Sequence, residues 1–287
     1  MKVSRFVEVP RFVKVGVLGA AGRMGRQICG AVEAADGLEL TAAVDTGDAR
    51  EPLSACDVVV DFTHPDAVMD NIAWCVGAGL NMVVGTTGFT PERLATVRSL
   101  VDAPRAELGR GATGSRSAHG QADGRHAHGG VGDGRKVGVL IAPNFSIGAV
   151  LMAHFAEIAA PFFESAEIVE LHHPRKVDAP SGTAVDTARR MAAARAAAGV
   201  GAGPDATTQQ IAGARGSVVD GIHVHALRLS GLTASQEVHL SSDGEVLVLR
   251  DDARDRSCFM PGILRAIRWV PEHPGLTVGL ATVLGLV

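Results

Sequence analysis

The chain has 287 residues, of which 46% are hydrophobic, and a net charge of −4 at pH 7. This length predicts one large or two medium domains, and the negative charge argues against nucleic acid as the main partner. Apolar runs are too short for a transmembrane helix, and charged residues interrupt the N-terminal segment where a secretory signal needs an apolar core, so we expect no membrane partner. Four cysteines without paired spacing favour reduced thiols and a cytoplasmic protein.

A glycine-rich loop follows the first predicted strand, residues 13–18, and precedes a predicted helix. Its residues are Gly19, Ala20, Ala21, Gly22, Arg23, Met24 and Gly25. Glycines in this position permit a tight turn and a close approach of the backbone to a pyrophosphate, so the loop is a candidate dinucleotide site. The spacing is G-x-x-G-x-x-G where G-x-G-x-x-G is commoner, and the alternative is an ordinary strand–helix turn.

The second predicted strand, residues 38–44, ends at Asp45. Dinucleotide-binding folds place a carboxylate about twenty residues after the loop, where it accepts hydrogen bonds from the ribose hydroxyls of the adenosine. Asp45 favours NADH, because a 2′-phosphate would meet a like charge. Arg23 would offset that repulsion, so NADPH stays open as the cofactor.

Strand and helix patterns then alternate, with strands at 57–62 and 81–84 and helices expected from Pro65 and Thr90-Pro91. This order predicts a doubly wound, Rossmann-type parallel sheet, whose ligands bind beyond the carboxyl ends of the strands. The residues at those ends are Gly19, Asp45, Phe62, Thr63, Gly85, Thr86 and Thr87.

Residues 103–135 contain almost no large apolar side chain, and we expect a disordered insertion. Its histidines, His119, His126 and His128, are not expected to hold a metal, because a flexible loop presents no fixed geometry. Order resumes with a strand at 137–141 and a helix to about Ala160. The turn between them contains Ala142, Pro143, Asn144 and Phe145, which we expect to touch the nicotinamide or to form a hinge into a second domain.

A second motif spans residues 170–184, between a predicted strand (166–171) and a predicted helix (183–198). Its candidate site residues are His172, His173, Lys176, Ser181, Gly182 and Thr183. Ser181 suits the N-cap, and a helix N-terminus with a nearby lysine and histidines can receive a small carboxylate and supply protons. The alternative is a pair of histidines that serve only in structural hydrogen bonds.

The remaining chain predicts strands at 222–229, 235–240 and 245–250, joined by turn-like residues as antiparallel hairpins. His223 and His225 lie on one face and are expected to be a surface or interface feature. A helix at 259–269 and a strand at 276–280 are expected to return to the first domain. We therefore predict a dinucleotide-binding domain (13–143), a second α+β domain with a mixed or antiparallel sheet (144–250), and a C-terminal return (251–287).

Both motifs together resemble the dihydrodipicolinate reductase family over nearly the whole chain. The matching segments are 19–25, Asp61-Phe62-Thr63, 85–89, 142–146 and, most specifically, 170–184. The resemblance implies reduction of 4-hydroxy-tetrahydrodipicolinate with NADH or NADPH, with loss of water, in lysine and diaminopimelate biosynthesis. It also implies a homotetramer assembled through the sheets of the second domain.

Carried over by motif, the resemblance implies that His172 and Lys176 donate protons and that His173, Ser181, Gly182 and Thr183 hold the dicarboxylate substrate. The cofactor-lining residues that it implies are those of the glycine loop, Asp45, Gly85, Thr86, Thr87, Ala142, Pro143, Asn144 and Phe145. No metal is implied. Two alternatives stay open, an amino- or imino-acid dehydrogenase on the same fold and a non-catalytic NAD(P)H-binding homologue; the presence of both His172 and Lys176 argues against the second.

Overall fold

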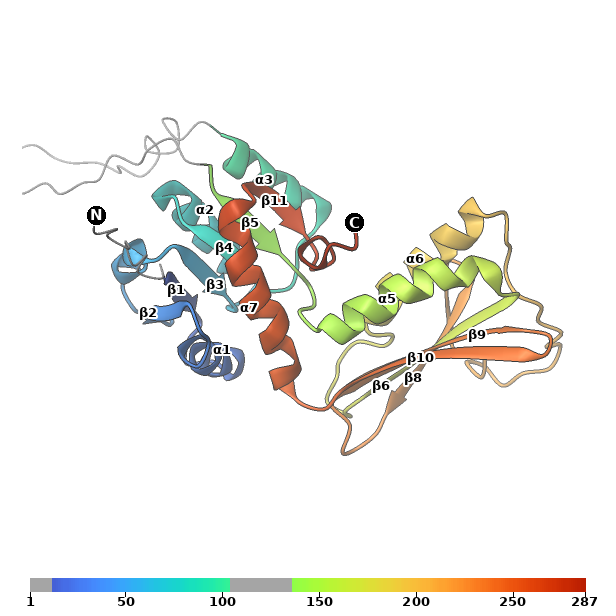
Figure 1. Cartoon of the computed structure of the whole chain (residues 1–287). Helices are drawn as coiled ribbons and strands as arrows, with labels where there is room; N and C mark the ends of the chain where they lie inside the picture. The colour runs from blue at the N-terminus through green and yellow to red at the C-terminus, as the bar shows by residue number, and fades with distance from the viewer. Residues whose placement is uncertain (1–11, 104–135) are drawn as a thin grey trace, which may run out of the picture. The chain divides into compact units, whose positions relative to one another are not determined.

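The computed structural model describes residues 12–103 and 136–287 (Figure 1). The described chain forms two compact units, of which the first ends at Pro143 and also contains Ile263–Gly279, whereas the second contains Asn144–Gly262 and Leu280–Val287. The return to the first unit thus begins at Ile263, later than the expected Asp251. The expected insertion, apart from Ala103, lies outside the described residues, as do its three histidines.

Six described strands form a parallel sheet in the first unit, in the order β11-β5-β4-β3-β1-β2. Their bounds are β1 (Val13–Leu18), β2 (Leu38–Val44), β3 (Val58–Asp61), β4 (Asn81–Val84), β5 (Gly138–Ile141) and β11 (Gly275–Val278). The chain runs outward from β1 in both directions, and crossovers between parallel strands are right-handed. Helix α1 (Arg23–Glu33) therefore covers one face, and α2 (Val68–Ala78) and α3 (Pro91–Asp102) cover the other. The Rossmann-type prediction is confirmed.

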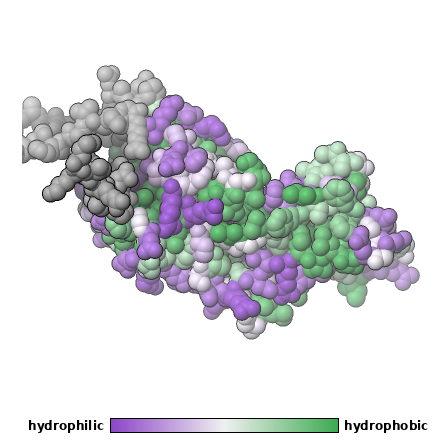
Figure 2. Space-filling model, in the orientation of Figure 1, coloured by the Kyte–Doolittle hydropathy of each residue, from purple (hydrophilic) through white to green (hydrophobic). Residues whose placement is uncertain are grey.

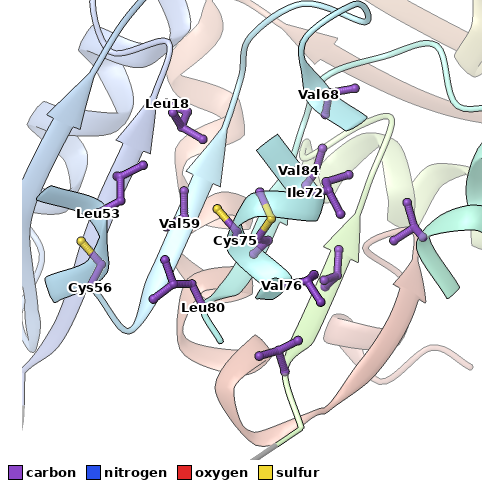
Figure 3. Packing of buried hydrophobic residues seen from close by; sticks show 14 of the residues in the cluster. Leu18, Leu53, Cys56, Val59, Val68, Ile72, Cys75, Val76, Leu80 and Val84 are labelled. Carbon is purple, nitrogen blue, oxygen red and sulfur yellow. The ribbon is translucent and has the colours of Figure 1, made fainter. Parts of the chain in front are cut away.

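The core between this sheet and α2 and α3 consists of aliphatic and thiol side chains (Figure 3). Val59 of β3 packs in one cluster with Ile72 and Cys75 of α2, and all three are fully buried. Burial raises the pKa of Cys75 to about 12, so its thiol stays protonated and unreactive at neutral pH.

Helix α2 does not begin at Pro65 as predicted. The amides of Ala67 and Val68 both bond to the carbonyl of His64, which makes a turn of residues 64–67 before the helix starts at Val68. Helix α7 (Met260–Trp269) lies on the side of α1, since the Arg268 guanidinium donates to the Asp36 carbonyl at 3.0 Å.

The second unit contains a mixed sheet in the order β10-β9-β6-β8-β7. Its described strands are β6 (Ser165–His172), β7 (Ser217–Val219), β8 (Ile222–Arg228), β9 (Ala234–Ser242) and β10 (Glu245–Ala253). Of the two predicted hairpins, the one between β9 and β10 is present. Strand β8 pairs in parallel with β6, which lies between β8 and β9, so a hairpin between β8 and β9 was the wrong prediction. The inner face of β6 is buried at Ala166, Ile168 and Glu170, as suits a strand with a neighbour on each side.

Helices α5 (Ile147–Ala159) and α6 (Gly182–Ala197) cover one face of this sheet. Met152 of α5 and Met191 of α6 pack with Ile168 of β6 in the core of the unit. Apolar surface over α5 is visible in Figure 2. Phe155 and Ile158 of this helix are exposed. Within the described ranges, no helix combines the length and apolarity that crossing a bilayer requires.

Candidate functional site

The glycine loop of the first unit fits a dinucleotide pyrophosphate. Gly19 has φ +79°, and a Cβ on Gly25 would lie 2.0 Å from the Gly19 carbonyl oxygen, so both positions require glycine. Gly22 is the N-cap of helix α1 and has no side chain to cover the helix start, and the first turn contains no acidic residue. The N–H groups of a helix start point outward with a partial positive charge, which suits a phosphate anion.

Asp45 lies beside this loop. Its Oδ1 accepts from the Thr46 amide at 2.7 Å and its Oδ2 from the Ala21 amide at 2.6 Å. The bond from Thr46, which has the larger effect, and the bond from Ala21 hold the pKa of Asp45 below its usual value. Arg23 is exposed and Met24 half-buried in the first turn of α1. The structure thus brings the predicted carboxylate and the predicted loop together.

Asp61 is a buried residue that the sequence reasoning gave no role. Its Oδ1 accepts from the amide and hydroxyl of Thr63, at 2.9 and 2.7 Å, and from the Thr86 hydroxyl at 2.9 Å. Its Oδ2 accepts from the side-chain amide of Asn71 at 2.8 Å. One carboxylate therefore ties the loop after β3 to the loop after β4. The sequence did contain a signal for a role of Asp61, because this acidic residue ends a strand that is otherwise apolar.

The predicted residues after β4 and β5 occupy different surroundings. Gly85 packs against the Phe62 ring so closely that a Cβ at this position would lie 2.1 Å from a ring atom. Thr87 is exposed. Ala142 is buried and its amide bonds to the Val84 carbonyl at 3.0 Å. Pro143 is exposed and ends the first unit.

Asn144 opens the second unit. Its Oδ1 accepts from the Ser146 amide at 2.8 Å, and its Nδ2 lies 3.4 Å from the Thr183 hydroxyl. Asn144 was expected to contact the cofactor, and within its own unit it adjoins a residue of the predicted substrate site. Phe145 beside it is buried, with its carbonyl against Gly262.

Replacement of Asp61 by asparagine should destabilise both loops, because the amide adds a donor where four donors converge. We expect the free energy of unfolding to fall by about 1–3 kcal/mol and NADH to bind more weakly. Calorimetry and a fluorescence titration with NADH measure the two effects. Asp66→Asn changes the same charge at an exposed site in the neighbouring turn and is the control; equal melting temperatures for the two variants would contradict the assignment.

The second motif assembles where β6 ends and α6 begins. The Ser181 Oγ accepts from the Ala184 amide at 3.2 Å, so Ser181 is the N-cap as predicted. Gly182 and Thr183 form the first helical residues, and the first turn contains no acidic side chain. The amides of this helix start are therefore suited to a carboxylate.

The basic side chains of the motif lie in the turn before the helix. The Lys176 ammonium is 2.7 Å from a carboxylate oxygen of Asp178. His173 is half-buried, and its Nδ1 is enclosed with no hydrogen-bond partner among the residues described. The Lys176 amide closes the turn on the His173 carbonyl at 3.2 Å. These two cationic or titratable groups thus share one short turn with His172 at its start.

His172 ends β6 and is bound to a carboxylate that received no predicted role. Its Nδ1 lies 2.6 Å from Oε2 of Glu170, whose side chain is 0% exposed. Arg228 of β8 binds both oxygens of the same carboxylate at 2.7 Å. Residues two apart on a strand share a face, so the sequence held a signal for Glu170. It held none for Arg228, which is distant in the chain. No cluster of His, Cys, Asp and Glu suited to a metal occurs in the part of the chain that the structure describes.

Two family models match this chain. The model of the dihydrodipicolinate reductase N-terminus covers residues 13–106, and that of the dihydrodipicolinate reductase C-terminus covers residues 148–284. A 4-hydroxy-tetrahydrodipicolinate reductase from Cutibacterium acnes is 53% identical over 275 residues, which are 96% of this chain and 99% of that protein. The Thermobifida fusca protein of the same name is also 53% identical, over 96% of this chain and all of its own length, 100%.

A solved structure extends the similarity to three dimensions. The dipicolinate-bound dihydrodipicolinate reductase from Paenisporosarcina sp. TG-14 is 31% identical and superposes with a TM-score of 0.74, covering 94% of this chain and 99% of its own. The chain belongs to the dihydrodipicolinate reductase family and is an oxidoreductase that uses NADH or NADPH.

Proposed function

We propose that this chain reduces 4-hydroxy-tetrahydrodipicolinate to tetrahydrodipicolinate, with loss of water, at the junction of β6 and α6. The observation that carries the proposal is the clustering of His172, Lys176 and the capped start of α6 in one small region of the second unit. The relative from Paenisporosarcina, which is described as bound to dipicolinate, supports a dicarboxylate ligand. The reaction belongs to lysine and diaminopimelate biosynthesis.

Two carboxylates on the substrate require two sets of donors. We assign one set to the amides of Gly182 and Thr183 with the Thr183 hydroxyl, which Ser181 positions through its cap bond. We assign the other to His173, whose Nδ1 has no partner in the described chain, and to the charge of Lys176. The substrate carboxylate would pair with the Lys176 ammonium in place of Asp178, which is its partner in this structure.

Bound NADH or NADPH supplies the hydride, and the glycine loop with Asp45 is the cofactor site that we assign. The substrate loses its hydroxyl group and a neighbouring ring hydrogen as water, which leaves a conjugated ring. The hydride then places negative charge on that ring, and His172 delivers the proton that neutralises it, with Lys176 as a second donor. Burial lowers the pKa of His172 more than the Glu170 bond raises it, and the charges of Lys176 and Arg228 act in the same direction as burial. The imidazolium therefore releases its proton readily.

The test follows NADH and NADPH oxidation optically, while dihydrodipicolinate synthase generates the substrate in the cuvette. Steady oxidation that depends on the synthase supports the proposal. Oxidation with amino- or imino-acid substrates alone would identify a different dehydrogenase. Tight NADH binding with no oxidation of any substrate would identify a non-catalytic homologue.

We also propose a cytoplasmic homotetramer that assembles through the face of the second sheet opposite α5 and α6. Val246 and Val248 of β10 are 67% and 45% exposed on this face, which also carries the half-buried His223 and His225 of β8. Val248→Asp should dissociate the assembly by placing an unpaired charge in an interface. Sedimentation velocity measures the mass. Val278→Asp, at an equally exposed strand valine of the first unit (48%), is the control; a Val248→Asp protein that stays tetrameric would contradict this choice of face.

A further inference from the structure

The Glu170 carboxylate accepts hydrogen bonds from three elements of the second unit. Its Oε1 accepts from the Ser181 amide at 3.1 Å and from Arg228 at 2.7 Å. Its Oε2 accepts from His172 at 2.6 Å and from the other terminal nitrogen of Arg228 at 2.7 Å. Each oxygen has two donors, so the buried charge is fully satisfied.

The state of Glu170 decides which nitrogen of His172 is available. Burial alone raises the pKa of Glu170, but the bonds from Arg228 and His172 bring it below its usual value, so the group is a carboxylate at neutral pH. A carboxylate only accepts, and Nδ1 of His172 must therefore carry a hydrogen. Nε2 is left as the atom that gives or takes the catalytic proton.

Arg228 opposes the effect of Glu170 on His172. The guanidinium also donates to the carbonyls of Leu227 and Asp178, at 2.7 and 2.8 Å, which holds it in one orientation. Its charge opposes the attraction between the carboxylate and a proton on the imidazole, in the same direction as burial and the charge of Lys176. A carboxylate without this partner would attract that proton more strongly and make His172 a weaker acid.

We propose that Glu170 and Arg228 are a positioning pair for His172, in which Glu170 orients the ring and fixes its tautomer and Arg228 keeps its proton transferable. This inference rests on the proposed function, because it assigns the proton donor to His172. The rival explanation is that the two residues only join β6, β8 and the start of α6. The two explanations differ in what they predict for the titration of His172.

Glu170→Gln and Arg228→Gln should move the pKa of His172 in opposite directions. The first removes the negative charge and lowers it, and the second leaves the carboxylate uncompensated and raises it. Proton NMR follows the His172 ring signals with pH, and their absence from the His172→Gln spectrum identifies them. Loss of packing alone predicts no such opposition, so shifts of the same sign, or none in folded variants, would overturn the proposal.

Kinetics supplies the second readout. In Glu170→Gln the amide favours the other tautomer, and we expect kcat to fall on the order of 10²–10⁴-fold, by analogy with the carboxylate that orients a catalytic histidine elsewhere, with a far smaller change in KM. The pH above which turnover declines should shift down in Glu170→Gln and up in Arg228→Gln, since the donor must be protonated. A loss confined to KM would overturn the proposal.

The same strand offers a matched control. Glu167 binds Arg215 and, at 2.7 Å, His225, so it makes the same three-residue set on the opposite face of β6. Glu167→Gln should leave both kcat and the pKa of His172 unchanged. If the natural chain turns over no substrate, the proposed function fails, whereas the NMR titrations still decide whether the pair controls His172.

Discussion

The double variant His172→Ala with Lys176→Ala should lose turnover while it keeps its affinity for NADH. Positioned acid–base groups contribute about 10²–10⁴-fold each, so we expect kcat to fall by at least the lower of these factors. Cofactor affinity is retained because the glycine loop and Asp45 belong to the other unit. Optical assay of NADH oxidation and a fluorescence titration measure the two quantities on one preparation.

Arg175→Ala is the control for this experiment, because Arg175 is an exposed cation in the same turn. It should turn over like the natural chain. Full activity in the double variant would mean that the protons come from elsewhere and that the second motif has a structural role. The single variants then separate the two donors, of which His172 should account for the larger loss.

Gly25→Ala should disrupt the cofactor loop. The added Cβ would lie 2.0 Å from the Gly19 carbonyl oxygen and 2.7 Å from the Ala20 Cα, both backbone atoms that move only if the loop moves. Overpacking of this kind costs about 1–3 kcal/mol, and a comparable loss of binding free energy raises the Kd for NADH about 5- to 150-fold. Fluorescence titration gives the Kd, and calorimetry gives the melting temperature.

Gly30→Ala provides the matched control on the same helix. No heavy atom lies within 4 Å of a Cβ at Gly30, and the residue is exposed in α1. Alanine there should raise stability by about 0.5–1 kcal/mol, because glycine is costly inside a helix, and should leave the Kd unchanged. Equal affinities for the two variants would show that the tight approach at Gly25 has no part in binding.

Local patterns were sufficient for most elements of the first unit. Strand β1, the glycine loop, helix α1 and strand β2 follow one another closely, and their hydrophobic periods and turn residues are properties of neighbouring positions. The N-cap at Ser181 was also predictable, since a cap bond joins residues three apart. The start of α2 was not, because a proline suits a turn as well as the first turn of a helix.

The order of strands in the second unit depended on pairing between distant segments. Turn residues predict where β8 ends and β9 begins, but β6 lies between them in the sheet. Which strand takes the centre is decided by how the apolar inner faces pack against α5 and α6. That choice cannot be read from a turn.

The sequence by itself determined the fold class, the family motifs and the positions of His172 and Lys176, because these depend on residues close together in the chain. Only the tertiary structure decided which side chains from distant parts of the sequence contact one another. Arg228 reaches Glu170 from β8 because β6 and β8 pair in parallel, and Asp61 reaches Thr86 because two strands end at one edge of a sheet. Buried charges need partners wherever folding brings them, so such contacts follow from the packing of strands and not from sequence spacing.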